Sequence, residues 1–136
     1  MLTKLKFEKR SLIWLYIPIV KDIKEKEEDS GLRPYLLTNT ENGLYEFSTM
    51  TEHFKKPEHQ YIIRHEKNAL YQHKPINYNT KVFIKEPVLK RILGKFFYFL
   101  FPYQLNQKDF AEFKTQQAKY FSDPARLGKR YEIKVV

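Results

Sequence analysis

Residues 33–50 have the sequence RPYLLTNTENGLYEFSTM, in which two strand-like runs flank Glu41-Asn42-Gly43. Asn-Gly between two such runs is the strongest short-range signal for a β-hairpin, because a type I′ turn needs positive φ at both central residues. The stretch therefore predicts two antiparallel strands, and the second strand ends in the hydroxyl-rich segment Ser48-Thr49-Met50-Thr51.

Other parts of the chain also have strand-like composition. Residues 11–20 (SLIWLYIPIV) are β-branched and aromatic, so we expect a buried strand that ends near Pro18. Charge dominates residues 21–31, where we expect a solvated loop. Further strands are predicted at residues 60–65 and 81–85 and, as a final edge strand, in the C-terminal sequence RYEIKVV.

Two helices are predicted in the second half of the chain. Pro87 suits a first helical turn, and the helix that follows (VLKRIL) is expected to end near Gly94. A second helix is expected to begin after the capping residue Asn106 and to end at Ser122-Asp123-Pro124. Its predicted core side repeats at helical spacing and contains Phe110, Phe113, Gln117 and Phe121, with Ala118 alongside.

The length of 136 residues fits one domain, and 42% hydrophobic with 16% aromatic residues excludes a disordered chain. Strands followed by short helices predict an α+β fold, a small twisted sheet or half-open barrel crossed by one helix. We expect a single domain over residues 1–136, with the barrel at about 11–121 and a basic tail at 122–136. The aromatic run 96–103 (FFYFLFPY) is interpreted as core, and docking of a partner or a second copy is the alternative.

The chain carries a formal net charge of +9, which favours a polyanionic partner. It has no cysteine, so thiolate catalysis, disulfides and thiolate-bound metals are excluded. Gaps of six and eight residues separate the four histidines and do not place two metal ligands on one helical face. Because motifs for phosphate loops and nucleophile elbows are also absent, we expect no metal and no cofactor.

The apolar run at residues 12–20 follows a basic stretch but lacks a small-residue cleavage site. It is much shorter than the roughly 20 apolar residues of a membrane-spanning helix. The sequence therefore predicts a cytoplasmic protein with no membrane partner.

Arg33 is the first candidate for chemistry, because it precedes Pro34 at the start of a strand and its planar guanidinium matches two phosphate oxygens. The hairpin brings the hydroxyls of Ser48, Thr49 and Thr51 roughly opposite Arg33. Cleavage of RNA through its 2′-hydroxyl needs a proton acceptor, a cation for the phosphate and an acid for the leaving oxygen, and it needs no metal. The alternative is an ion pair between Arg33 and the acidic loop, with hydroxyl residues that only favour a strand end.

Basic residues near this hairpin are candidates for contacts to a nucleic acid. A cationic loop with His53, Lys55 and Lys56 follows the hydroxyl-rich segment. Further along, Arg64 and Lys81 alternate with tyrosines that are able to stack on single-stranded bases. The alternative is that these tyrosines fill a small core while the cations face water.

The order of these elements resembles that of the MazF/PemK/ToxN superfamily of endoribonuclease toxins. The similarity rests on Gly31-Leu32-Arg33-Pro34, on the strand end Phe47-Ser48-Thr49-Met50-Thr51, and on the segments INYNTKVFIKEPVLKRILGKF and NQKDFAEFKTQQAKYF, and it spans about residues 11–121. In place of the family's usual Gly-Asp before the first strand, this chain has Arg10-Ser11. The tail from Arg126 onward has no counterpart.

The resemblance implies a compact antiparallel barrel related to the SH3 fold, metal-independent cleavage of single-stranded RNA, a homodimer and neutralisation by a protein or RNA antitoxin. It implies that Arg33 stabilises the phosphate and that Ser48, Thr49 or Thr51 is the catalytic hydroxyl. Lys55 and Lys56 lie where the ToxN-like branch has a functional lysine. We therefore expect a toxin-like endoribonuclease, with a non-catalytic nucleic-acid-binding or protein-interaction module on the same barrel as the alternative.

Overall fold

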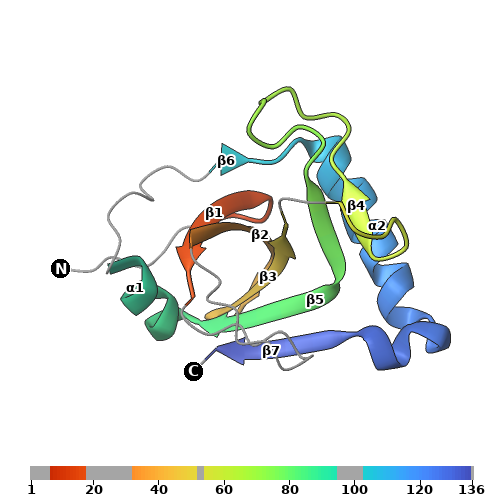
Figure 1. The fold of residues 1–136 in the computed structure, drawn as a ribbon. Coiled ribbons are helices and arrows are strands. Elements are labelled where there is room, and N and C mark those ends of the chain that lie inside the picture. Colours follow the sequence, from red (N-terminus) through yellow and green to blue (C-terminus); the bar gives the residue numbers. More distant parts are fainter. Residues whose placement is uncertain (1–6, 18–31, 52–53, 95–102, 136) are drawn as a thin grey trace.

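The computed structural model describes residues 7–17, 32–51, 54–94 and 103–135 (Figure 1). Seven strands and two α-helices follow one another in these residues, with one short 3₁₀ helix near the C-terminus. The elements are β1 (Ser11–Tyr16), β2 (Leu32–Glu41), β3 (Leu44–Met50), β4 (Gln60–Ile62), β5 (Pro75–Lys85), α1 (Glu86–Gly94), β6 (Tyr103–Gln104), α2 (Gln107–Ser122), η1 (Pro124–Lys129) and β7 (Tyr131–Val135).

The strands form one sheet in the order β4-β5-β3-β2-β1-β6, in which all neighbours are antiparallel. β7 pairs with β5 in the parallel direction. The sheet curls into a half-barrel, with α1 near one end of β5 and α2 alongside β4 (Figure 1). The predicted α+β fold with a half-open antiparallel barrel and a C-terminal helix is confirmed.

The predicted hairpin is present and joins β2 to β3. Asn42 has φ 51° and Gly43 has φ 75°, so both central residues lie in the left-handed region that a type I′ turn requires. The ladder continues from the pair Glu41 and Leu44 to the pair Tyr35 and Thr49. This register determines which residues of the two strands share a face of the sheet.

Both faces of the sheet are covered. Ile13, Leu15 and Tyr35 belong to one buried cluster, which also contains Leu89 of α1. The alternate residues Leu12 and Leu36 belong to a second cluster with Phe113 of α2. Successive residues of a strand point to opposite faces, so burial on both faces explains the continuous apolar runs of β1 and β2.

The second helix begins and ends where predicted. The side chain of Asn106 accepts a hydrogen bond from the backbone N–H of Lys108 at 2.8 Å, and Pro124 follows the C-cap Asp123. The predicted buried face is only partly right, because the buried residues of α2 are Asp109, Phe113, Gln117 and Tyr120.

Two of the predicted strands differ in length from the observed ones, and the predicted C-terminal strand is present. β4 is shorter than predicted because the backbone N–H groups of Arg64 and His65 donate to the Asp109 carboxylate and not to a neighbouring strand. β5 is longer and begins at Pro75, where a strand tolerates the missing N–H. The predicted C-terminal strand is β7, and its parallel pairing needs the long connection that α2 and η1 provide.

Some predictions concern residues outside the described ranges. These are the charged loop at residues 21–31 and most of the aromatic run, residues 96–102. In the part of the chain that the structure describes, no helix combines the length and apolar character needed to cross a bilayer.

Candidate functional site

The candidate site lies at a bend in β5. Ser48 of β3 pairs with Lys81 of β5, whereas Met50 pairs with Ile76. Between these two pairs, four residues of β5 (77–80) lie opposite a single residue of β3, Thr49. Figure 1 shows that β5 turns sharply along its length. Such irregularities redirect side chains and are frequent beside active sites.

Four polar side chains form a hydrogen-bond network at this bend. Asn77 Nδ2 donates to Thr49 Oγ1 at 2.8 Å. Gln60 Nε2 donates to Asn77 Oδ1 at 3.0 Å and to Thr51 Oγ1 at 3.3 Å. We call Thr49, Thr51, Gln60 and Asn77 the amide network. Gln60 is only 5% exposed, whereas Thr49, Thr51 and Asn77 are half-buried, so the network reaches from the protein interior to the surface.

The amide network also holds the cationic loop that follows β3. Gln60 Oε1 accepts hydrogen bonds from the backbone N–H of Lys55 at 2.8 Å and of Lys56 at 3.4 Å. Both lysines are exposed, and the exposed ring of Phe54 precedes them. The backbone of this loop is thus held at Gln60, whose amino group also bonds to Thr51 and Asn77. The predicted contact His53 lies outside the described residues.

Arg33 belongs to the same face of the sheet as Thr49. Tyr35 pairs with Thr49, and Arg33 lies two residues before Tyr35 on β2, where it pairs with Leu15 of β1 and is exposed. Diagonal neighbours of this kind on adjacent strands are about 7–8 Å apart. A bound phosphate is able to bridge this separation, because the arginine side chain is long.

Ser48 lies on the opposite face of the sheet. Its side chain is fully buried, and Oγ accepts a hydrogen bond at 3.0 Å from Gln117 Nε2 of α2. The three candidate hydroxyls are therefore divided: Thr49 and Thr51 belong to the amide network, and Ser48 is enclosed between the sheet and α2.

Lys81 and Arg64 are also on the α2 side, away from the amide network. Lys81 Nζ lies 4.2 Å from the centre of the Phe121 ring and 4.0 Å from a carboxylate oxygen of Glu46. Arg64 is exposed and lies 3.4 Å from a carboxylate oxygen of Glu112. An acid thus accompanies each of these two cations.

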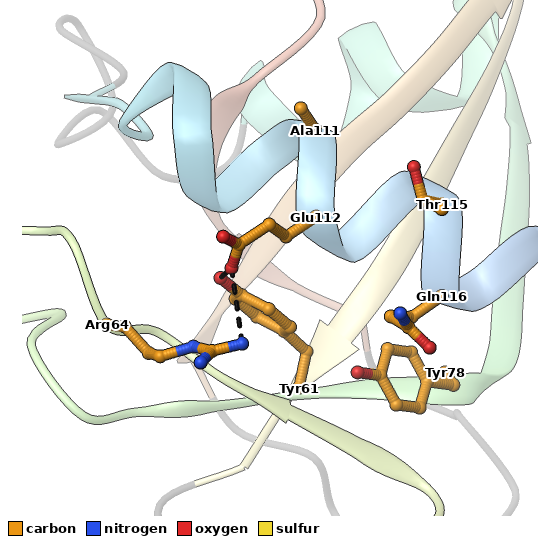
Figure 2. Close-up of a pocket in the computed structure, with 7 residues that line it drawn as sticks. All are labelled: Tyr61, Arg64, Tyr78, Ala111, Glu112, Thr115 and Gln116. Carbon is orange, nitrogen blue, oxygen red and sulfur yellow. Dashed lines mark hydrogen bonds and ion pairs between the residues drawn. The ribbon is translucent and has the colours of Figure 1, made fainter.

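A pocket of about 520 Å³ on this side is lined by residues of α2, β4 and β5 and by Arg64. Figure 2 shows the Glu112 carboxylate of α2 directed toward the Tyr61 hydroxyl and the Arg64 guanidinium, with Tyr78 at the lower right. Burial raises the pKa of Tyr78 to about 12, so its hydroxyl keeps its proton. The lining residues are Tyr61, Arg64, Tyr78, Ala111, Glu112, Thr115 and Gln116.

A cluster of two acids and a histidine extends from this pocket, and it was not predicted from the sequence. His65, Asp109 and Glu112 each have a potential ligand atom within 4.8 Å of the others. Asp109 is fully buried, however, and accepts hydrogen bonds from the Tyr61 hydroxyl at 2.7 Å and from the backbone N–H of Arg64 at 2.9 Å. These contacts give Asp109 a structural role. Asp109 and Glu112 are three residues apart on a helix, a spacing that was visible in the sequence.

Cations gather around His59, between the cationic loop and η1. Burial lowers the pKa of His59; the Glu58 carboxylate opposes this shift, and the charges of Arg126, Lys129 and Lys56 add to it. Its Nδ1 lies 2.7 Å from the Tyr120 hydroxyl. Arg126 Nη1 lies 3.5 Å from a carboxylate oxygen of Glu58, so η1 in the basic tail lies against the residues that precede β4.

The arrangement at the bend combines groups that suit a phosphodiester. Arg33 offers a fork of donors, the amide network offers two oriented hydroxyls, and the cationic loop offers two ammonium groups. Donors fixed in this way stabilise charge that develops on phosphate oxygens.

Two solved structures are similar to this chain in fold. The crystal structure of MazF (Form-I) from Deinococcus radiodurans aligns over 85% of this chain and 96% of its own, with TM-score 0.54 and 14% identity. The crystal structure of MazE-MazF (Form-II) from the same organism aligns over 85% of this chain and 94% of its own, with the same TM-score and identity. The chain has a MazF-like fold. No protein-family model and no curated protein matches the sequence.

Proposed function

We propose that the protein is a toxin-like endoribonuclease that cleaves single-stranded RNA without a metal. The observation that carries this proposal is the β2–β3 register, which makes Arg33 and Thr49 diagonal neighbours on one face of the sheet. The MazF-like fold supports the same conclusion at the level of architecture.

In the proposed reaction, the 2′-hydroxyl of a nucleotide gives its proton to water and its oxygen attacks the adjacent phosphorus, and the bond to the 5′-oxygen breaks as this oxygen takes up a proton from water. The products are a 2′,3′-cyclic phosphate and a 5′-hydroxyl. Arg33 offsets the negative charge that grows on the phosphate. The burial of Ser48 favours Thr49 or Thr51 as the hydroxyl that acts on this phosphate.

The remaining cations are proposed to hold RNA on both sides of the reacting phosphate. Lys55 and Lys56, with His53 before them, are closest to the amide network along the chain. Arg64 and Lys81 lie on the α2 side and are proposed as more distant contacts.

The proposal extends to partners and location. One of the similar structures is a MazE-MazF complex, which motivates a cognate antitoxin for this chain as well. We also propose a homodimer, a single domain over residues 1–136 and a cytoplasmic location, as expected for a toxin that acts on RNA.

The test is incubation of the purified protein with a mixed-sequence single-stranded RNA in EDTA, followed by mapping of the product ends. We expect discrete fragments that end in 2′,3′-cyclic phosphate. Arg33→Ala should lower the cleavage rate by about 10²–10³-fold, because one charge-stabilising donor is removed. Arg91→Ala, which removes an exposed arginine of α1, is the matched control.

Intact RNA at every protein concentration would contradict the nuclease assignment. If the same RNA were instead bound, and if affinity fell steeply with salt, the result would favour a non-catalytic nucleic-acid-binding module. Cleavage that survives Arg33→Ala would contradict the site assignment and leave the activity in place.

A further inference from the structure

In the amide network, each side-chain amide can be oriented in only one way. Two backbone N–H groups determine this orientation. The N–H groups of Lys55 and Lys56 only donate, so the atom of Gln60 that they contact is the carbonyl Oε1. The Gln60 amino group therefore faces Asn77 and Thr51. Gln60 is 5% exposed, so an exchange of its oxygen and nitrogen would leave nearly buried donors facing each other.

The same logic passes through Asn77 to Thr49. The Gln60 amino group only donates, so Asn77 must present Oδ1 to it at 3.0 Å. Asn77 Nδ2 then donates to Thr49 Oγ1 at 2.8 Å. A hydroxyl has a single proton, and this proton cannot lie on the line to Nδ2, because Nδ2 already supplies a proton there.

The Thr49 proton is therefore turned away from Asn77. Among residues 7–17, 32–51, 54–94 and 103–135, the structure describes no acceptor for it. Thr49 is half-buried and shares its face of the sheet with the exposed Arg33. A phosphate beside Arg33 supplies acceptor oxygens for this proton.

We propose that Gln60 and Asn77 are positioning residues that make the Thr49 hydroxyl a hydrogen-bond donor to a phosphate oxygen of bound RNA. This inference rests on the proposed function and deepens it. Thr49 then stabilises charge on the phosphate and does not accept the 2′-proton. The orientation originates in the loop backbone, so the loop that carries Lys55 and Lys56 also orients the hydroxyl.

The decisive variant is Asn77→Asp, which is nearly isosteric but replaces the Nδ2 donor by an acceptor. The Thr49 proton would then turn inward, so we expect kcat to fall on the order of 10²-fold with little change in KM. Asn77→Ala removes the donor without adding an acceptor, and its loss should be several-fold smaller. Asn79→Asp adds the same charge two residues along β5, outside the network, and is the matched control.

The second arm removes the hydroxyl. In a Thr49→Val background, Asn77→Asp should cause no further loss, because its effect acts through Thr49. If Asn77 had only a structural or only an electrostatic role, Asn77→Asp would still lower kcat in that background. The inference is overturned if Asn77→Asp lowers kcat no more than Asn77→Ala or Asn79→Asp does. It is also overturned if Asn77→Asp still lowers kcat in the Thr49→Val background. Thermal unfolding of each variant identifies losses that arise from misfolding.

Binding of an uncleavable 2′-deoxy oligonucleotide separates this inference from the proposed function. If the wild type does not cleave RNA, but Asn77→Asp weakens binding more than Asn79→Asp only when Thr49 is present, the positioning role stands and the nuclease assignment fails. Equal weakening by the two aspartate variants overturns the positioning role. Absence of binding by the wild type overturns both.

Discussion

Two polar networks lie on opposite sides of this sheet, and their chemistry differs. On the α2 side, buried Asp109 and Glu66 accept hydrogen bonds from tyrosine hydroxyls and backbone N–H groups. At the bend of β5, the amide network contains no ionised group and ends at the Thr49 hydroxyl. The backbone N–H groups of Lys55 and Lys56 bond to the amide network, whereas acids form the α2 network.

The difference indicates which network is structural. A buried carboxylate surrounded by protein donors has its acceptors satisfied, and it holds segments together. Asp109 joins α2 to the residues after β4, and Glu66 joins the same residues to the start of α2. The amide network leaves a donor directed outward beside Arg33, which suits a ligand.

The largest effect is expected from removing one hydroxyl on each side of the sheet. Thr49→Val should lower RNA cleavage by about 10²-fold or more, because a donor to the phosphate is lost. Ser48→Ala should retain cleavage and lower the free energy of unfolding by about 1 kcal/mol, because Gln117 loses a buried acceptor. Cleavage assays and urea unfolding of both variants are the measurements. Loss of cleavage in Ser48→Ala alone would reverse the assignment.

Removal of the central acid of the α2 network should reduce stability. Asp109→Ala leaves the backbone N–H groups of Arg64 and His65 without an acceptor, and we expect a loss of about 3 kcal/mol in the free energy of unfolding. Urea unfolding measures it, and Glu132→Ala on the exposed side of β7 is the control. A loss no greater than that of the control would show that this network does not support the fold.

The cationic loop should determine part of the salt dependence of RNA binding. Replacing Lys55 and Lys56 by alanine should reduce the slope of log affinity against log salt by about 1.4, because each phosphate contact to a single strand contributes roughly 0.7. Fluorescence anisotropy over a salt series measures the slope. Alanine at Lys85 and Lys90, which lie at the other end of β5 and on α1, removes the same charge. Equal slopes for the two double variants would contradict a specific role of the loop.

The smallest expected effect is the contribution of Glu66 in the α2 network to the pH dependence of the free energy of unfolding. Burial acts to raise the pKa of Glu66, but hydrogen bonds from Tyr103 and from the backbone of Asn68, Asn106 and Lys67 outweigh it and hold the pKa below its ordinary value of 4.5. The carboxylate therefore stabilises the fold above pH 4.5, and this contribution disappears as the pH falls through the lowered pKa. Urea unfolding should show that wild type exceeds Glu66→Gln in stability at pH 7 and that the gap narrows below pH 4.5. A constant gap would contradict this.

Local signals in the sequence were sufficient for the hairpin, for the caps of α2 and for most strand positions. Asn42-Gly43 and Asn106 act through their own backbone and immediate neighbours, so their effect can be predicted from a few residues. The burial of Asp109 could not be predicted in this way. It depends on two backbone groups that are more than 40 residues away along the chain.

The candidate residues of the site could be predicted from the sequence, because arginine before proline and a hydroxyl-rich strand end are visible without a fold. Which of these residues lie on the same face of the sheet depends on the tertiary structure. The irregular β3–β5 register leaves Thr49 opposite the bend, and strand alternation turns Ser48 toward Gln117 of α2. The roles of Gln60 and Asn77 were likewise invisible, since an amide acquires a direction only from the partners that folding brings to it.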